Sequence, residues 1–148
     1  MLTLREVTLL HREYDAIPLT VTIPSDLDTP LSCYLKWAAK YPVNFLFESV
    51  EGGESLARYS FIGADPSESW SFASSGIEHQ AGKSVEAIST PPLEVVRYAS
   101  RIGKVYQPDG LPGFLGGLVG YFGYETALWS ERLPRHTNPI GWPDAWLA

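Results

Sequence analysis

Reactive and metal-binding side chains are scarce in this chain of 148 residues, which contains one cysteine and three histidines. The single Cys33 cannot form a disulfide within the chain, and such cysteine usage fits a reducing cytoplasm. His11, His79 and His136 lie far apart and show no metal-ligand spacing, so we expect each at the surface. The sequence contains no nucleophile elbow, dinucleotide fingerprint or complete phosphate-binding loop. It therefore predicts no catalytic residue and no metal ligand.

Long apolar segments and excess positive charge are also absent. Residues 111–124 carry no charge before Glu125, but a membrane-spanning helix needs about 20 apolar residues. Residues 1–14 contain several charges and lack the apolar core of a signal peptide. The net charge of −6 disfavours nucleic acid and anionic membranes as partners, since both are negatively charged. We expect a cytoplasmic protein that binds neither.

The chain has the composition of one globular domain, with 45% hydrophobic and 19% charged residues. Apolar residues recur at helical spacing over 30–40 and 91–103, each after a Thr-Pro start signal. We expect an α+β fold, an antiparallel β-sheet with these two main helices packed on one side. Expected strands are 17–23 at a sheet edge, 43–47, 55–62, 67–74, 77–80 and one or two within 114–124, with a short helix at 125–132. Residues 135–148 read as turn-rich, and Trp142 and Trp146 belong to no periodic element.

The stretch from Val43 to Ile62 is the most informative part of the sequence. Val43 to Phe47 is an apolar run that reads as a strand buried on both faces. It ends in two polar residues, Glu48 and Ser49, and a Glu-Gly-Gly-Glu turn over 51–54 follows. The returning strand carries Arg58. The predicted hairpin therefore brings an acid, a hydroxyl and a guanidinium near one another.

Two interpretations of this hairpin are open on chemical grounds. Glu48 or Ser49 could bind an ammonium group while Arg58 binds a carboxylate, which would suit a zwitterionic ligand. Alternatively, Arg58 pairs with Glu48 across the hairpin and Ser49 bonds to the backbone. Structural ion pairs are common, so chemistry alone favours the second interpretation.

Two motifs in the chain resemble the amino-terminal region of anthranilate synthase component I, a family of chorismate-utilising enzymes. Residues 46–49, Leu-Phe-Glu-Ser, are similar to the family's Leu-Leu-Glu-Ser segment, with Phe47 in place of a leucine, and a Gly-Gly turn and Arg-Tyr-Ser-Phe-Ile-Gly over 58–63 follow. Residues 116–125 resemble the family's Gly-Gly-x-x-Gly-Tyr-x-x-Tyr-Asp/Glu segment. The two motifs together cover most of the chain at the expected separation.

The resemblance implies that Glu48, Ser49, Arg58 and Leu46 contact tryptophan, the feedback inhibitor of the family enzyme. It also implies that residues 1–148 form only an amino-terminal domain with no catalytic residues or cofactor of its own. In the family, chorismate and Mg²⁺ bind in a carboxy-terminal catalytic domain, which makes anthranilate with ammonia from a glutamine amidotransferase subunit, component II. We therefore expect residues 1–148 to be inactive alone. Their expected partners are the carboxy-terminal catalytic domain and component II.

Two alternatives to this interpretation remain. The first is the amino-terminal part of the related aminodeoxychorismate synthase component I, which makes a folate precursor; the Arg-Tyr-Ser-Phe-Ile-Gly segment looks closer to the anthranilate enzyme. The second is a stand-alone amino-acid-binding or interaction module. Its exposed apolar face, formed by residues 43–47, Trp142 and Trp146, would make it a homo-oligomer.

Overall fold

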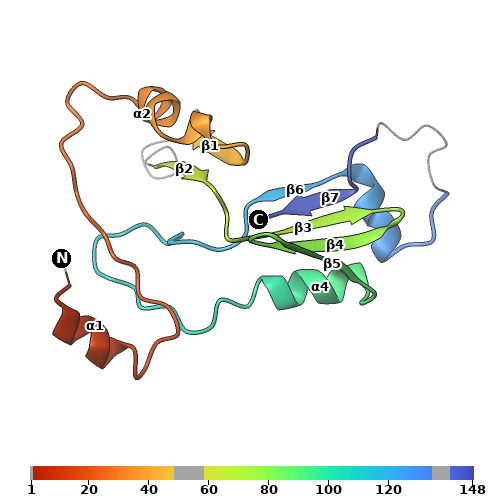
Figure 1. Cartoon of the computed structure of the whole chain (residues 1–148), viewed down its shortest axis with the longest axis horizontal. Coiled ribbons are helices and arrows are strands. Elements are labelled where there is room, and N and C mark those ends of the chain that lie inside the picture. Colours follow the sequence, from red (N-terminus) through yellow and green to blue (C-terminus); the bar gives the residue numbers. More distant parts are fainter. Residues whose placement is uncertain (1, 49–58, 135–140) are drawn as a thin grey trace.

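The computed structural model describes residues 2–48, 59–134 and 141–148 of the chain. These residues form antiparallel sheets and short helices, which confirms the predicted α+β class. A two-stranded sheet pairs β1 (Asn44–Glu48) with β2 (Ser60–Ala64). A separate five-stranded sheet has the order β5-β4-β3-β7-β6 and contains β3 (Glu68–Ala73), β4 (Gly76–Ala81), β5 (Ser84–Ile88), β6 (Gly120–Phe122) and β7 (Ala145–Leu147). Figure 1 shows the two sheets side by side, with an open arrangement of connecting segments around them.

The hydrophobic core lies on one face of the five-stranded sheet. Trp70 and Phe72 alternate with serines along β3, so both aromatic rings point to the same face. Their register partners Ile77, Ala145 and Leu147 are buried with them. Helix α4 (Pro92–Ala99) runs along this face (Figure 1) and contributes the buried Val95. The core is therefore a single layer between one helix and one sheet face.

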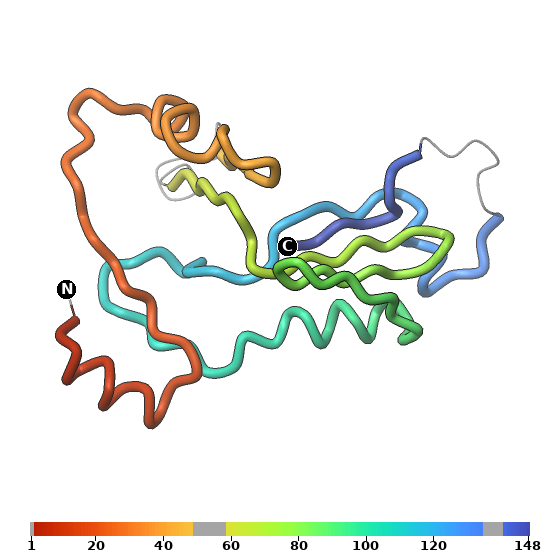
Figure 2. Tube along the Cα trace, viewed as in Figure 1, coloured from red at the N-terminus to blue at the C-terminus, as the bar shows by residue number. Residues whose placement is uncertain are grey.

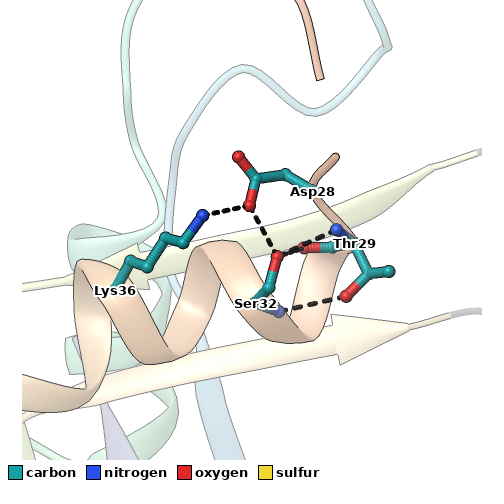
Figure 3. A network of polar contacts seen from close by, with 4 residues as sticks. All are labelled: Asp28, Thr29, Ser32 and Lys36. Carbon is teal, nitrogen blue, oxygen red and sulfur yellow. Dashed lines mark hydrogen bonds and ion pairs between the residues drawn. The ribbon is translucent and has the colours of Figure 1, made fainter. Parts of the chain in front are cut away.

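The start of α2 (Pro30–Lys36) is held by Thr29, the cap residue that the sequence predicts, together with Asp28, Ser32 and Lys36 (Figure 3). The Ser32 amide donates to Thr29 Oγ1 at 3.1 Å, and the Thr29 amide donates to Ser32 Oγ at 2.9 Å. Asp28 accepts from Ser32 Oγ at 2.8 Å and pairs with Lys36. This reciprocal capping satisfies amides that the first turn leaves without intrahelical partners. A short 3-10 helix, η1 (Ala38–Lys40), follows α2. The predicted helix over 30–40 is therefore divided into α2 and η1.

The two predicted helices do not share one sheet. Helix α2 and η1 contact the β1–β2 hairpin, whereas α4 packs on the five-stranded sheet. An additional helix, α1 (Leu4–Leu10), begins with a capping box between Thr3 and Glu6 and lies apart from both sheets in Figure 1. Helices α2 and α4 thus cover separate sheets, and the expectation of a single sheet with both helices on one side was wrong.

Several predicted strand assignments also differ from the structure. Residues 17–23 form no strand, and only Ala16 makes an isolated bridge, with Val105. Within 114–124 only β6 is a strand, and η2 (Tyr124–Trp129) is a 3-10 helix where a short helix was expected. The final residues, expected to be irregular, contain β7, which lies between β3 and β6 in the sheet. A strand of three residues has no detectable period, so only its neighbours reveal it.

No helix within residues 2–48, 59–134 and 141–148 is long and apolar enough to cross a membrane.

Candidate functional site

Leu46 and Glu48 share one face of the β1–β2 hairpin. The antiparallel register pairs Leu46 with Ile62 and Glu48 with Ser60. Asn44 lies on the same face because alternate residues of a strand point the same way. Its side-chain oxygen accepts a hydrogen bond from the Tyr34 hydroxyl of α2 at 2.5 Å, so α2 packs on this side. Leu46 is half-buried, while Glu48 is exposed where the strand ends. The hairpin thus presents a carboxylate beside an apolar side chain.

The other two predicted site residues, Ser49 and Arg58, lie outside the described residues. The structure therefore brings together only Leu46 and Glu48 of the predicted set. The antiparallel pairing of Glu48 with Ser60 shows that the chain reverses direction between these two strands, and the predicted turn over 51–54 lies outside the described residues.

The opposite face of the hairpin is aromatic and borders a groove of about 1180 Å³. Phe45, Phe47 and Phe61 line this groove together with Asn44, Ser60 and Ile62, whereas Leu46 and Glu48 do not. The Phe45 and Phe47 rings are 5.0 Å apart, and Phe61 makes an edge-on contact with Phe114 at 5.4 Å. The expectation that residues 43–47 are buried on both faces was wrong, since Phe47 is 51% exposed. The sequence predicted Phe45 and Phe47 on a buried strand and did not reveal the groove.

The two sequence motifs meet across this groove. Gly116, Gly117 and Gly120 of the second motif line it together with residues 59–63 of the first. At Gly63 an added Cβ would collide with the Phe45 ring, so the glycine allows the ring to cross the neighbouring strand. Segments about 50 residues apart in sequence are therefore adjacent in the fold. Their shared groove explains why both motifs are rich in glycine and aromatic residues.

His79 belongs to a polar cluster on the five-stranded sheet, which the sequence did not predict. Its Nε2 is 2.9 Å from a Glu68 carboxylate oxygen of β3, and its Nδ1 is 3.0 Å from a Glu86 oxygen of β5. The imidazole stacks on Trp70 with ring centroids 4.8 Å apart. Hydrogen bonding to Glu86, and more weakly to Glu68, raises the pKa of His79 above its ordinary value, although burial opposes the shift.

The side chain of His79 is only 16% exposed, so the expectation of a surface histidine was wrong for this residue. His11 is exposed as expected, and His136 lies outside the described residues. Glu68 and Glu86 flank His79 only because three strands stand side by side in register. A local sequence pattern could not have shown this. In the part of the chain that the structure describes, no three His, Cys, Asp or Glu side chains are grouped as metal ligands.

Comparison with known proteins supports the resemblance seen in the two motifs. No family model matches the sequence. The chain is 42% identical over 144 residues to anthranilate synthase component 1 of Neisseria gonorrhoeae, a match that covers 90% of this chain. The proteins of the same name from Pseudomonas aeruginosa and Acetivibrio thermocellus are 41% and 36% identical, over 90% and 89% of this chain.

The matched region is a minor part of those relatives. The chain spans about 28% of the length of the Neisseria and Pseudomonas proteins and 27% of the Acetivibrio protein. Identity above one third along nine-tenths of this chain, together with two motifs that border one groove, leaves little room for chance similarity. Over nine-tenths of its length, this chain is therefore similar to one segment of anthranilate synthase component 1.

Proposed function

We propose that this chain is the amino-terminal regulatory and structural part of an anthranilate synthase component 1 and contributes part of a tryptophan-binding site. The complete enzyme would convert chorismate to anthranilate in the cytoplasm, with ammonia supplied by a glutamine amidotransferase subunit. Chorismate and magnesium would be bound by a carboxy-terminal catalytic domain. The residues described here would bind the effector and pack against that domain.

The observation that carries the proposal is the exposed carboxylate of Glu48 at the end of β1, with Leu46 on the same face. An ammonium group is bound well by an accessible carboxylate. An indole ring needs an apolar surface, which Leu46 offers in part. Ser49 and Arg58 would complete the polar contacts by donating to or accepting from the amino acid. The remaining wall would come from polypeptide outside these residues.

Feedback inhibition on this proposal is a linkage effect. Tryptophan can shift the enzyme toward an inactive arrangement only if it binds that arrangement more tightly. Typical coupling free energies of 1–3 kcal/mol correspond to changes of about 5–150-fold in affinity. The hairpin is suited to this role because its two faces differ. One face carries Leu46 and Glu48, whereas Phe61 on the other face contacts Phe114, which precedes the glycine-rich motif.

The direct test is inhibition of chorismate conversion by tryptophan in the complete component 1 protein that carries this segment. We expect Glu48→Ala to raise the tryptophan concentration for half-inhibition by about tenfold or more, because the ammonium group would lose its counter-charge. Ser49→Ala should act in the same direction with a smaller effect. Inhibition is expressed relative to the turnover of each variant without tryptophan.

Glu94→Ala is the matched control, because Glu94 is an exposed carboxylate on α4, away from the hairpin. Its inhibition curve should coincide with that of the unmodified protein. Equal inhibition curves for Glu48→Ala, Ser49→Ala and the control would remove the effector site from this hairpin. The similarity to anthranilate synthase component 1 would be unaffected by that result.

The names of the relatives favour the anthranilate branch over aminodeoxychorismate synthesis. The three proteins compared above are all named anthranilate synthase component 1. The stand-alone module has no specific observation in its favour. An assay for anthranilate, which is fluorescent, against one for aminodeoxychorismate separates the two branches directly.

A further inference from the structure

The segment from Ile17 to Ile23 has the side-chain pattern of a strand but is not part of a sheet. Apolar residues occupy every second position, with Thr20 and Thr22 between them. Leu19, Val21 and Ile23 are 73%, 66% and 71% exposed. Three β-branched or branched apolar side chains on one face of an extended segment are suited to a sheet. Their joint exposure is unusual for a surface that stays in water.

Within the described part of the chain, the backbone of this segment also has no hydrogen-bond partner. Among the described residues, no hydrogen bond involves the backbone of residues 17–24. Immediately before it, the Asp15 amide donates to the Lys104 carbonyl at 2.8 Å, and the Tyr106 amide donates to the Ala16 carbonyl at 2.9 Å. This short parallel bridge ends at Pro18, which has no N–H to continue it. Figure 2 shows the chain running on from there toward α2 as an extended segment, away from the five-stranded sheet.

An extended segment with free backbone groups and alternating apolar side chains fits one kind of partner, the edge of another β-sheet. It does not fit the groove described above, because Thr20 lines that groove while Leu19, Val21 and Ile23 do not. A strand of this length spans roughly 23 Å. Alone it would bury less than the roughly 1,200 Å² of a stable interface between separate molecules. A partner within the same polypeptide avoids that limit, because the two strands are tethered.

The exposed area of the chain shows that such a partner has room to bind. The chain exposes 11619 Å². A compact monomer of 16.4 kDa exposes roughly 7500 Å². The chain also spans only about 28% of the length of its Neisseria relative, so most of a component 1 polypeptide lies outside it. We propose that residues 17–23 are a β-strand whose neighbouring strand belongs to the part of a component 1 polypeptide outside these 148 residues.

This proposal rests on the proposed function only in assuming that the segment works within a longer component 1 polypeptide. Hydrogen exchange of that complete protein tests the pairing. Amides of alternate residues in 19–23 should exchange on the order of 100-fold more slowly than those of an unpaired segment. Fast exchange throughout 17–23 would overturn the proposal.

A pair of substitutions tests which face is buried. Val21→Asp places a charge on the apolar face, whereas Thr22→Asp places the same charge on the alternate face. In the complete protein we expect Val21→Asp to lower the melting temperature by roughly 2–4 °C, while Thr22→Asp changes it little. Equal effects of the two variants would contradict the strand assignment.

The alternative partner is a strand from a second copy of the chain. Sedimentation of the 148-residue chain tests this alternative. A concentration-dependent dimer that Val21→Asp abolishes and Thr22→Asp preserves would overturn the proposal in favour of self-pairing. None of these measurements depends on tryptophan. Failure of the effector site at Glu48 and failure of the strand at 17–23 are therefore separate outcomes.

Discussion

At position 79, an imidazole lies between two carboxylates from neighbouring strands, with the Trp70 ring beneath it. Both nitrogens face acceptors, so the doubly protonated ring satisfies both contacts and the neutral ring satisfies one. The hydrogen bond to Glu86 is the larger cause of the raised pKa, and that to Glu68 adds to it. Glu94, Arg97 and Arg101 line the cavity between α4 and this part of the sheet. His79 therefore joins three strands through a charge that depends on pH.

The raised pKa predicts the direction of a pH effect on stability. The folded pKa of His79 exceeds the unfolded value of about 6.5. The stabilisation is fully present below that value and is lost as pH rises through the folded pKa. The difference in melting temperature between the unmodified chain and His79→Gln should be largest near pH 6 and should disappear in alkaline solution. A difference that grows with pH would contradict the assignment.

The two carboxylates can be separated by an NMR titration of His79. Glu86→Gln should lower the pKa of the imidazole more than Glu68→Gln, because the hydrogen bond to Glu86 is the larger cause. Glu78→Gln is the control, since Glu78 is an exposed acid of the same strand on the opposite face. It should leave the His79 titration almost unchanged.

At the scale of elements, the close approach of β6 to β7 depends on a glycine. A Cβ at Gly120 would collide with the Trp146 carbonyl oxygen and lie 2.9 Å from the Leu147 Cα. Both are backbone atoms, which cannot turn away as a flexible side chain can. Gly120→Ala should therefore destabilise the chain by about 1–3 kcal/mol, as overpacking does, through separation of β6 from β7. Thermal unfolding measures the loss.

Gly113→Ala is the matched control for this prediction. An added Cβ at Gly113 meets no atom within 4 Å. Its effect should stay within about 1 kcal/mol and favour the folded state, because alanine restricts the unfolded chain. Similar melting temperatures for Gly120→Ala and Gly113→Ala would show that the two strands separate without cost.

Elements with strong local signals could be predicted from the sequence. The Thr29 cap and Pro30 mark the start of α2 correctly, and alternation of serine with Trp70 and Phe72 marks β3. Elements defined by their neighbours could not be predicted. β7 has three residues, and residues 17–23 have the period of a strand but no strand beside them among the described residues. The alternation of apolar and polar residues predicts which segments can form a strand. Whether the strand forms depends on a second strand beside it.

The same distinction applies to the candidate site. The sequence placed Leu46 and Glu48 on the first strand of a hairpin, and the antiparallel β1–β2 pairing confirms it. It did not reveal that Phe47 and Phe61 face a groove shared with the glycine-rich motif. That face depends on contacts between segments distant in sequence, which no local pattern records.

At the scale of the whole molecule, the exposed area exceeds that of a compact monomer by about 4000 Å². Obligate interfaces bury 2,000–5,000 Å² summed over both partners, so an excess of this size on one chain is at least as large as the face that such a partner covers. Hydrophobic side chains contribute to it on the hairpin, on 17–23 and at Trp142. The open shape in Figure 1 agrees with this area.

This openness predicts the behaviour of the 148-residue chain by itself. We expect calorimetry to show no micromolar binding of tryptophan, because the remaining wall of the site would be missing. The exposed apolar side chains should bind a hydrophobic dye such as ANS strongly. Micromolar tryptophan binding would mean that these residues contain a complete site. Weak dye fluorescence would mean that the apolar faces are covered by self-association.

Helix α4 has no side-chain cap and ends at Ala99, so its predicted Thr90 cap and its predicted end near residue 103 were wrong. The sequence by itself determined the α+β class, the Thr29 cap at the start of α2 and the resemblance to anthranilate synthase component 1. Each of these depends on neighbouring residues or on a motif, so each is local information. Only the tertiary structure decided that the helices cover separate sheets, that His79 lies between Glu68 and Glu86, and that the two motifs border one groove. These features arise where distant segments meet. Contacts between distant segments form when the whole fold gains free energy from burial and strand pairing. No single stretch of the sequence encodes such contacts.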